Sequence, residues 1–123
     1  MDQLPDHTPD PSLPATTATD LLAVIGTPSA PLVVDVRRAE PYGKDPHTIA
    51  TSLRVVPEAV AEQARAWPRE RPIVVFCVHG HKVSQAACRT LLDAGLQASY
   101  LAGGMDGWVV ARGPTMRKGA LHV

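Results

Sequence analysis

A cysteine followed by a short polar stretch is the feature of this sequence most suited to chemistry. Cys77 directly follows the apolar run Pro72 to Phe76 and precedes Val78-His79-Gly80-His81-Lys82. Successive backbone amides around a glycine can form an anion-binding nest, and a helix that begins near Lys82 would direct its positive end at the sulfur. Such surroundings favour the thiolate, which is the nucleophilic form of cysteine. The spacing therefore predicts a nucleophilic Cys77 beside a loop that holds an anionic adduct.

Two other interpretations of this loop compete with the reactive one. Free cysteine is among the most buried residue types, so Cys77 could simply end a core strand. The glycine and the cationic or titratable side chains of His79, His81 and Lys82 favour the reactive interpretation. Cys77, His79 and His81 could also form a metal set, but it supplies only three ligands with no evident fourth partner. We therefore expect loop histidines that tune substrate charge, and no metal or other cofactor.

Three further residues invite a chemical interpretation. Cys88 lies eleven residues after Cys77 and could be a resolving thiol or a packed small residue that faces the sheet. We expect the packed residue, because a rigid helix would have to bring Cys88 to Cys77. Asp35 and Arg37 flank the end of another predicted strand. We expect them to form a buried pair that supports the floor of the site, rather than to act in acid–base catalysis.

Strands and helices that alternate along the chain must position these residues. Apolar runs predict strands at residues 32–36, 53–56, 72–76 and 98–101. The run from Leu32 to Val36 is continuous except for Asp35, rather than alternating, which is typical of a strand buried on both faces of a parallel sheet. Residues 37–52 have no clear period and contain two prolines and a glycine, so they predict a long irregular crossover.

Capping residues mark four predicted helices. Thr16 or Thr17 caps a helix that Gly26 stops, and Pro57 opens one that continues to Trp67. A third helix begins near Lys82 and ends at Gly95, and the last covers residues 104–112. Strands that alternate with helices predict an α/β fold, with a central, mostly parallel sheet of about five strands and helices on both faces. Ligands bind such sheets beyond the carboxyl ends of the strands, where Cys77 lies.

Length, charge and composition limit the function classes. The chain has 123 residues, enough for one domain. Twelve Lys plus Arg balance twelve Asp plus Glu, so the net charge of zero argues against nucleic acid as a partner. The longest apolar runs are far shorter than the roughly 20 residues that cross a membrane. The N-terminus has acidic residues and prolines in place of a signal peptide, and two cysteines are too few for a disulfide framework. We expect a cytoplasmic protein.

The two ends of the chain differ in composition from the middle. Residues 1–15 carry four of the twelve prolines and few apolar side chains, so we expect a disordered tail that could add a short edge strand near its end. Residues 16–112 form the predicted domain, and residues 113–123 a C-terminal tail.

Several segments together resemble a single-domain rhodanese. They are Val34-Asp35-Val36-Arg37, then Phe76-Cys77-Val78-His79-Gly80-His81-Lys82, then Ala86-Ala87, Leu91-Leu92 and Ala94-Gly95-Leu96, then Tyr100-Leu101-Ala102-Gly103-Gly104-Met105-Asp106-Gly107-Trp108. The resemblance covers about residues 17–112 and implies the three-layer rhodanese-like fold. The motif Cys-Val-His-Gly-His also resembles that of a subgroup linked to chromate-resistance proteins.

The resemblance implies a rhodanese-type sulfurtransferase. Cys77 would accept a sulfane sulfur from a donor such as thiosulfate, become a persulfide and pass the sulfur to a thiol or cyanide-like acceptor. The backbone amides of Val78, His79, Gly80, His81 and Lys82 would cradle the persulfide. Lys82 stands where the family often has Arg, which replaces a bidentate fork with a point charge. Partners would be these small molecules, with no nucleic acid and no membrane, and the protein would be a monomer or weak dimer.

Two alternatives to sulfur transfer remain at this stage. Related cysteine phosphatases and arsenate reductases need Cys, five residues and then Arg, whereas Val83 is the sixth residue after Cys77 here. Phosphoryl chemistry is therefore disfavoured. The other alternative is a non-enzymatic rhodanese-like module that binds a partner or senses redox state or an oxyanion. Such a module has no need of a cysteine with its glycine and cations, so the sequence favours the enzyme.

Overall fold

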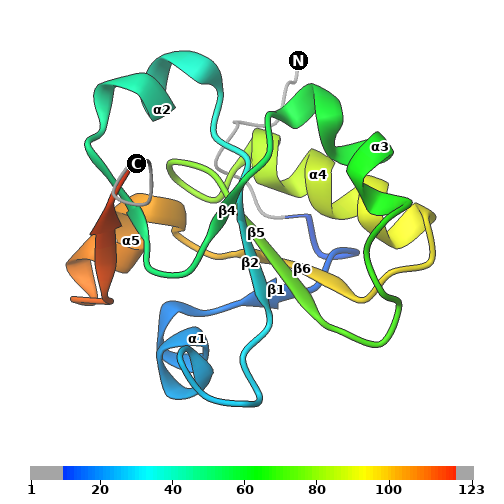
Figure 1. The fold of residues 1–123 in the computed structure, drawn as a ribbon, viewed down its shortest axis with the longest axis horizontal. Coiled ribbons are helices and arrows are strands. Elements are labelled where there is room, and N and C mark those ends of the chain that lie inside the picture. Colours follow the sequence, from blue (N-terminus) through cyan, green and yellow to red (C-terminus); the bar gives the residue numbers. More distant parts are fainter. Residues whose placement is uncertain (1–9, 119–123) are drawn as a thin grey trace.

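The sheet that positions Cys77 is parallel throughout. The computed structural model describes residues 10–118 of the chain. Its central sheet has five strands in the order β1-β6-β5-β2-β4, and each neighbouring pair is parallel (Figure 1). These strands are β1 (Ala15–Thr16), β2 (Leu32–Asp35), β4 (Leu53–Arg54), β5 (Ile73–Phe76) and β6 (Ala98–Leu101). β5 is the middle strand, so Cys77 follows the most enclosed strand of the sheet.

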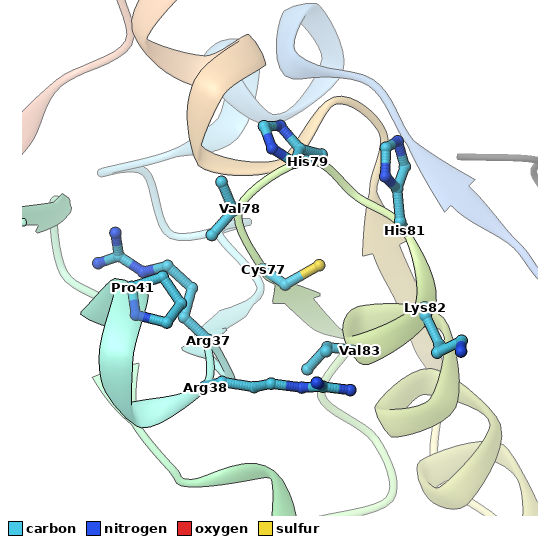
Figure 2. Close-up of a pocket in the computed structure, with 9 residues that line it drawn as sticks. All are labelled: Arg37, Arg38, Pro41, Cys77, Val78, His79, His81, Lys82 and Val83. Carbon is cyan, nitrogen blue, oxygen red and sulfur yellow. The ribbon is translucent and has the colours of Figure 1, made fainter. Parts of the chain in front are cut away.

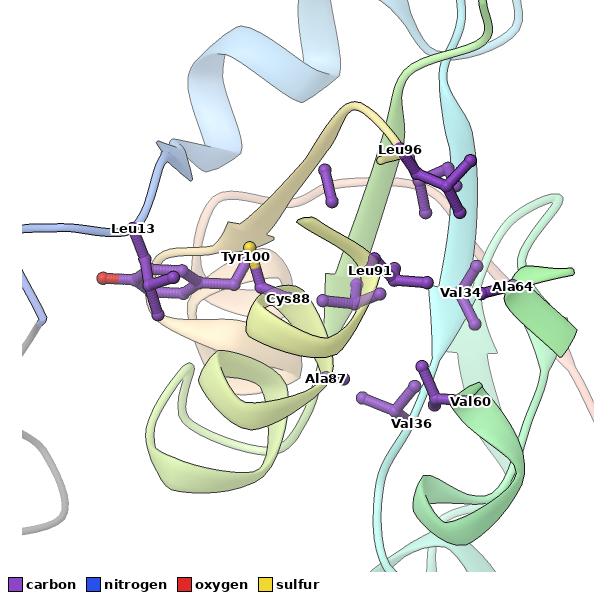
Figure 3. Close-up of a cluster of buried hydrophobic side chains, with 13 residues drawn as sticks. Leu13, Val34, Val36, Val60, Ala64, Ala87, Cys88, Leu91, Leu96 and Tyr100 are labelled. Atoms are coloured by element: carbon purple, nitrogen blue, oxygen red, sulfur yellow. The ribbon is translucent and has the colours of Figure 1, made fainter. Parts of the chain in front are cut away.

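Side chains of the central strands alternate between two cores, one on each face of the sheet. In β2 and β5, Val34 and Val75 point into one core, while Val33 and Val74 point into the other. Burial on both faces explains why the strand sequences are continuously apolar. Figure 3 shows the first core, where Leu91 packs between α4 and the sheet.

Helices cover both faces. The first core is closed by α3 (Val60–Ala64) and α4 (Lys82–Asp93), and the second by α1 (Ala18–Val24) and α5 (Gly104–Val110) (Figure 1). Trp108 is completely buried in the second core, and its Nε1 donates to the carbonyl of Pro114 at 2.9 Å. Within residues 10–118, no helix combines the length and apolarity needed to cross a membrane. The predicted α/β class, with helices on both faces of a five-stranded sheet, is confirmed.

Local capping signals act as the sequence predicts. Thr17 Oγ1 accepts a hydrogen bond from the amide of Asp20 at 3.0 Å and so caps α1. Gly95 has a φ of +86° just after α4, a conformation that glycine adopts without strain. These signals determine where the helices on each side of the sheet begin and end.

The prediction of an irregular crossover over residues 37–52 is wrong. This segment contains α2 (Ala39–Lys44) and β3 (His47–Ile49). Pro41 does not prevent the helix, because it lies in the first turn. Backbone N–H groups there have no acceptor within the helix, so proline, which lacks an N–H, loses no hydrogen bond. β3 pairs antiparallel with β7 (Thr115–Arg117), which lies in the segment predicted as a C-terminal tail.

Other predicted boundaries differ in extent. The helix predicted from Pro57 to Trp67 is a 3₁₀ turn, η1 (Pro57–Ala59), followed by the short α3. In the predicted N-terminal tail, residues 1–9 lie outside the described residues, whereas Leu13 is buried in the first core and Ala15 begins β1. Residues 119–123 also lie outside the described residues.

Candidate functional site

Cys77 lies where β5 ends and a cavity begins. The cavity has a volume of about 280 Å³ and opens beside the carboxyl ends of β5 and β2 (Figure 2). Its lining residues are Arg37, Arg38, Pro41, Cys77, Val78, His79, His81, Lys82 and Val83. Only 5% of Cys77 is exposed, so the sulfur is reached through this cavity rather than from an open surface.

The loop after Cys77 is shaped by hydrogen bonds to α5. The amides of Met105 and Asp106 donate to the carbonyls of Cys77 and Val78 at 2.8 and 2.9 Å. In a trans peptide the N–H points opposite to the C=O, so the amides of Val78 and His79 are directed away from α5. Among the described residues, none accepts a hydrogen bond from these two amides. They are the kind of donors that can hold an anion formed on the sulfur.

Glycines allow this loop and the turn that leads into α5 (residues 102–104, the α5 turn) to meet backbone to backbone. Gly80 has a φ of +76°, and a Cβ there would lie 2.6 Å from the carbonyl oxygen of Leu101 and 2.8 Å from the amide of Gly103. A Cβ on Gly104 would lie 2.5 Å from the carbonyl oxygen of Cys77. Gly80 is predicted from the sequence to bind substrate through its backbone amide. It packs against the α5 turn and is not among the residues that line the cavity.

Positive or titratable side chains stand along the rim of the cavity. His79 and His81 lie side by side with ring centroids 5.4 Å apart, and Lys82 opens α4 (Figure 2). His79 Nδ1 lies 2.9 Å from Asp106 Oδ2, and both side chains are more than half exposed. Within residues 10–118, no three His, Cys, Asp or Glu side chains converge in a way that could hold a metal ion. The side chains of His79, His81 and Lys82 thus offer hydrogen-bond donors to an anion at the rim.

Ser84 is a site residue that the sequence analysis missed. Its side chain is completely buried, and Cys77 Sγ donates to Ser84 Oγ at 3.1 Å. Because a hydroxyl can rotate, the same group can donate to the sulfur once Cys77 is a thiolate. A helix tilts its side chains toward its N-terminus, so a serine in the first turn of α4 reaches back to the loop. That tilt is the signal that could have found it.

Asp35 and Arg37 form a buried ion pair at the end of β2. Arg37 Nε and Nη2 donate to the two carboxylate oxygens of Asp35 at 3.0 and 2.7 Å, and Nη1 donates to Asp45 at 2.8 Å. Burial opposes the charge on Arg37, but hydrogen bonds and charges from Asp35 and Asp45 outweigh it and raise the pKa of Arg37. Figure 2 shows the Arg37 guanidinium directed away from the sulfur, so this residue supports the floor of the cavity instead of facing its interior.

The wall opposite the Cys77 loop is α2. Pro41 lines the cavity, and the next residue, Tyr42, is held by cations from three other segments. The Tyr42 ring centroid lies 4.0 Å from Arg54 Cζ, 3.9 Å from Lys118 Nζ and 5.4 Å from Arg37 Cζ. Lys118 also donates a hydrogen bond to the Tyr42 carbonyl. Contacts across the chain therefore position α2 over the site.

Cys88 is remote from this chemistry. It is completely buried in the first core between α4 and the sheet, near Tyr100 (Figure 3). Burial raises the pKa of the Cys88 thiol to about 11, although Arg89 lowers it slightly. Both cysteines are free thiols. At neutral pH Cys88 is therefore protonated and shielded, as a packing residue would be.

Comparisons with known proteins agree with this geometry. The family model of the rhodanese-like domain matches residues 17–111. The chain belongs to the rhodanese-like domain family. The thiosulfate sulfurtransferase GlpE of Coxiella burnetii is 31% identical over 78 residues, which are 63% of this chain and 70% of that protein. The resemblance to a rhodanese is therefore confirmed, and membership in this family supports a sulfurtransferase-like function.

Solved rhodanese-like structures share the fold. The rhodanese-related protein of Thermoplasma volcanium matches with a TM-score of 0.71 and 29% identity, covering 84% of this chain and 97% of that one. A full-length protein from Lactobacillus plantarum matches with a TM-score of 0.76 over 84% of this chain and 87% of that one. At 24% identity, the second match shows a common fold alone.

Proposed function

We propose that this rhodanese-like protein is a sulfurtransferase that moves a sulfane sulfur from thiosulfate or a similar donor to a thiol or cyanide-like acceptor. The relatedness to a thiosulfate sulfurtransferase supports the reaction type. The observation that carries the proposal is the placement of Cys77, the only cysteine among the residues lining the cavity, beneath a loop whose amides point away from α5. That placement supports a group-transfer route through a covalent intermediate on Cys77.

The first half-reaction loads sulfur on Cys77. The thiolate attacks the outer sulfur of thiosulfate, a new S–S bond forms to Cys77, and the S–S bond of thiosulfate breaks. Sulfite leaves with the electron pair of the broken bond. The amides of Val78 and His79 and the cation of Lys82 are suited to stabilise the persulfide anion and the sulfonate oxygens.

The second half-reaction discharges the sulfur. An acceptor thiolate or cyanide attacks the outer sulfur of the persulfide, the S–S bond to Cys77 breaks, and Cys77 leaves as a thiolate. The acceptor departs as a persulfide or as thiocyanate. The two displacements balance without any external oxidant or reductant, so the protein needs no redox cofactor for this cycle.

The proposed partners are small molecules, and the proposed compartment is the cytoplasm. A cavity of about 280 Å³ suits a small oxyanion but not a folded polypeptide. Two free thiols suit a reducing compartment.

Mass spectrometry of the intact protein after treatment with thiosulfate tests the proposal. We expect the wild type to gain the mass of one sulfur atom and to lose it on addition of cyanide, with thiocyanate released. Cys77→Ser should gain no sulfur, while Cys88→Ser should behave like the wild type because Cys88 is buried away from the cavity. A folded wild type that gains no sulfur would instead favour a non-enzymatic binding or sensing module. Equal loss in both variants would favour a two-cysteine redox mechanism.

A further inference from the structure

A second cavity adjoins the one that holds Cys77. It has a volume of about 450 Å³ and shares Arg38, Lys82 and Val83 with the first. Its other lining residues are Pro57, Glu58, Ala86, Ala87 and Thr90. Because the same three side chains line both cavities, the second cavity lies directly beside the one that holds Cys77.

Small side chains on α4 leave this second cavity open. Ala86 and Ala87 follow Lys82 and Val83 by one helical turn, so the four residues lie on one side of α4. Methyl groups at these two positions leave room between α4 and η1, where longer side chains would fill the space. The cavity is thus partly apolar, with Arg38 and Lys82 as its cations and Glu58 as its anion.

Arg38 lies at the junction of the two cavities and has side-chain hydrogen-bond donors that are available to a ligand. It precedes the first residue of α2, is exposed, and makes no side-chain capping hydrogen bond. Among the described residues the Arg38 guanidinium has no hydrogen-bond or ion-pair partner, in contrast to that of the neighbouring Arg37. Figure 2 shows its side chain running below Val83 toward the start of α4. A guanidinium presents five N–H donors in a planar fork that matches a carboxylate or sulfonate.

We propose that the second cavity is the acceptor subsite, and that Arg38, together with Lys82, makes the protein specific for small organic thiols that carry a carboxylate. This inference rests on the proposed sulfurtransferase function and names the acceptor class. The carboxylate binds at the junction, and the carbon skeleton lies against Val83, Ala86 and Ala87. The acceptor thiol loses its proton to solvent and attacks the outer persulfide sulfur as described above. Cyanide fills only the first cavity and uses no part of this subsite.

Discharge of preloaded protein separates acceptor recognition from sulfur uptake. The wild type is loaded with thiosulfate, freed of excess donor, and mixed with 3-mercaptopropionate, 2-mercaptoethanol or cyanide while loss of the persulfide is followed. We expect a preference for 3-mercaptopropionate over 2-mercaptoethanol at equal thiolate concentration. Arg38→Ala should lower that preference about tenfold, because a charge-assisted hydrogen bond to the carboxylate is lost. Thiol ionisation is the same with both proteins, so it cancels in this comparison.

Two variants provide matched controls. Glu58→Gln removes the anion from the second cavity and should raise the preference for 3-mercaptopropionate, in the direction opposite to Arg38→Ala. Arg65→Ala removes an exposed cation that lines neither cavity, and it should leave the preference unchanged.

The outcomes distinguish this inference from the function on which it rests. A wild type that loads sulfur and releases it to cyanide, but whose thiol preference is unaffected by Arg38→Ala, overturns the acceptor subsite alone. A protein acceptor would give that same result, with slow discharge by both thiols. Failure of the wild type to load sulfur overturns the proposed function and the subsite with it.

Discussion

At the scale of single residues, the two cysteines show how surroundings decide the chemistry of one side chain. Cys88 is enclosed by apolar neighbours, and the resulting rise of its pKa to about 11 keeps it protonated at neutral pH. Cys77 is also poorly exposed, but it has a hydroxyl beside its sulfur and backbone amides in the next residues. Burial alone therefore does not separate the packing thiol of Cys88 from the proposed nucleophile Cys77; the polar groups around the sulfur do.

Ser84 is expected to stabilise the Cys77 thiolate. A hydrogen bond to a charged group contributes about 1.5 to 3 kcal/mol, so Ser84→Ala should slow sulfur uptake from thiosulfate by about tenfold or more. Alkylation of Cys77 by a small neutral reagent should slow as well, because it uses the same sulfur. Ser99→Ala serves as the control, because the Ser99 hydroxyl pairs with Thr16 at 2.6 Å in β1. Uptake and alkylation at the wild-type rates would remove Ser84 from the site.

At the scale of elements, the contact between the Cys77 loop and the α5 turn determines where the loop amides point. Gly80→Ala should break this contact, because its Cβ would lie 2.6 Å from a backbone oxygen that cannot move aside easily. We expect destabilisation by about 2 kcal/mol or more and loss of most sulfur transfer, measured by urea unfolding and by thiosulfate turnover.

Gly26→Ala is the matched control for that substitution. Gly26 has a φ of +77°, close to that of Gly80, but a Cβ there would meet nothing within 4 Å. Only the backbone strain of a left-handed alanine remains, about 1 to 2 kcal/mol, and activity should persist. Equal effects of the two substitutions would show that backbone strain, and not the contact with α5, accounts for the result at Gly80.

Elements encoded by neighbouring residues could be predicted from the sequence, and elements held by distant contacts could not. β5, α4 and the loop between them have their signals within one short stretch: a continuous apolar run, a glycine and helical spacing. α2 has no buried residue, and Tyr42 is held by Arg54 and Lys118 from far along the chain. The spacing of apolar residues within a short segment cannot show such distant contacts. For this reason the sequence predicts an irregular segment at residues 37–52.

The same distinction applies within the candidate site. Cys77 and its polar loop are recognisable because the residues that matter are adjacent in sequence. Arg38 reaches the cavity from the connection between β2 and α2, and Ser84 reaches Cys77 only because α4 begins in a particular orientation. Both depend on how separate elements are placed, so the sequence pattern did not reveal them.

At the scale of the whole molecule, the first core links protonation to folding. Cys88 and Tyr100 are both buried there, and burial raises the pKa of each above its ordinary value. In the unfolded chain, by contrast, a cysteine loses its proton near pH 8.5. The folded state therefore binds more protons than the unfolded state in alkaline solution, and stability must fall as the pH rises through this range.

The Cys88 contribution can be isolated by comparing unfolding free energies of the wild type and Cys88→Ala in urea, with a reductant present. Below about pH 8.5 the thiol is protonated in both states, so its contribution is complete; between there and pH 11 it declines by about 2 to 3 kcal/mol. Cys88→Ala should be less stable than the wild type at pH 7, because a buried group is lost, yet its stability should fall less between pH 8.5 and 10.5. Tyr100 is present in both proteins, so its titration cancels in the difference. Parallel stability curves over this range would mean that the thiol reaches solvent in the folded state, contrary to its complete burial between α4 and the sheet.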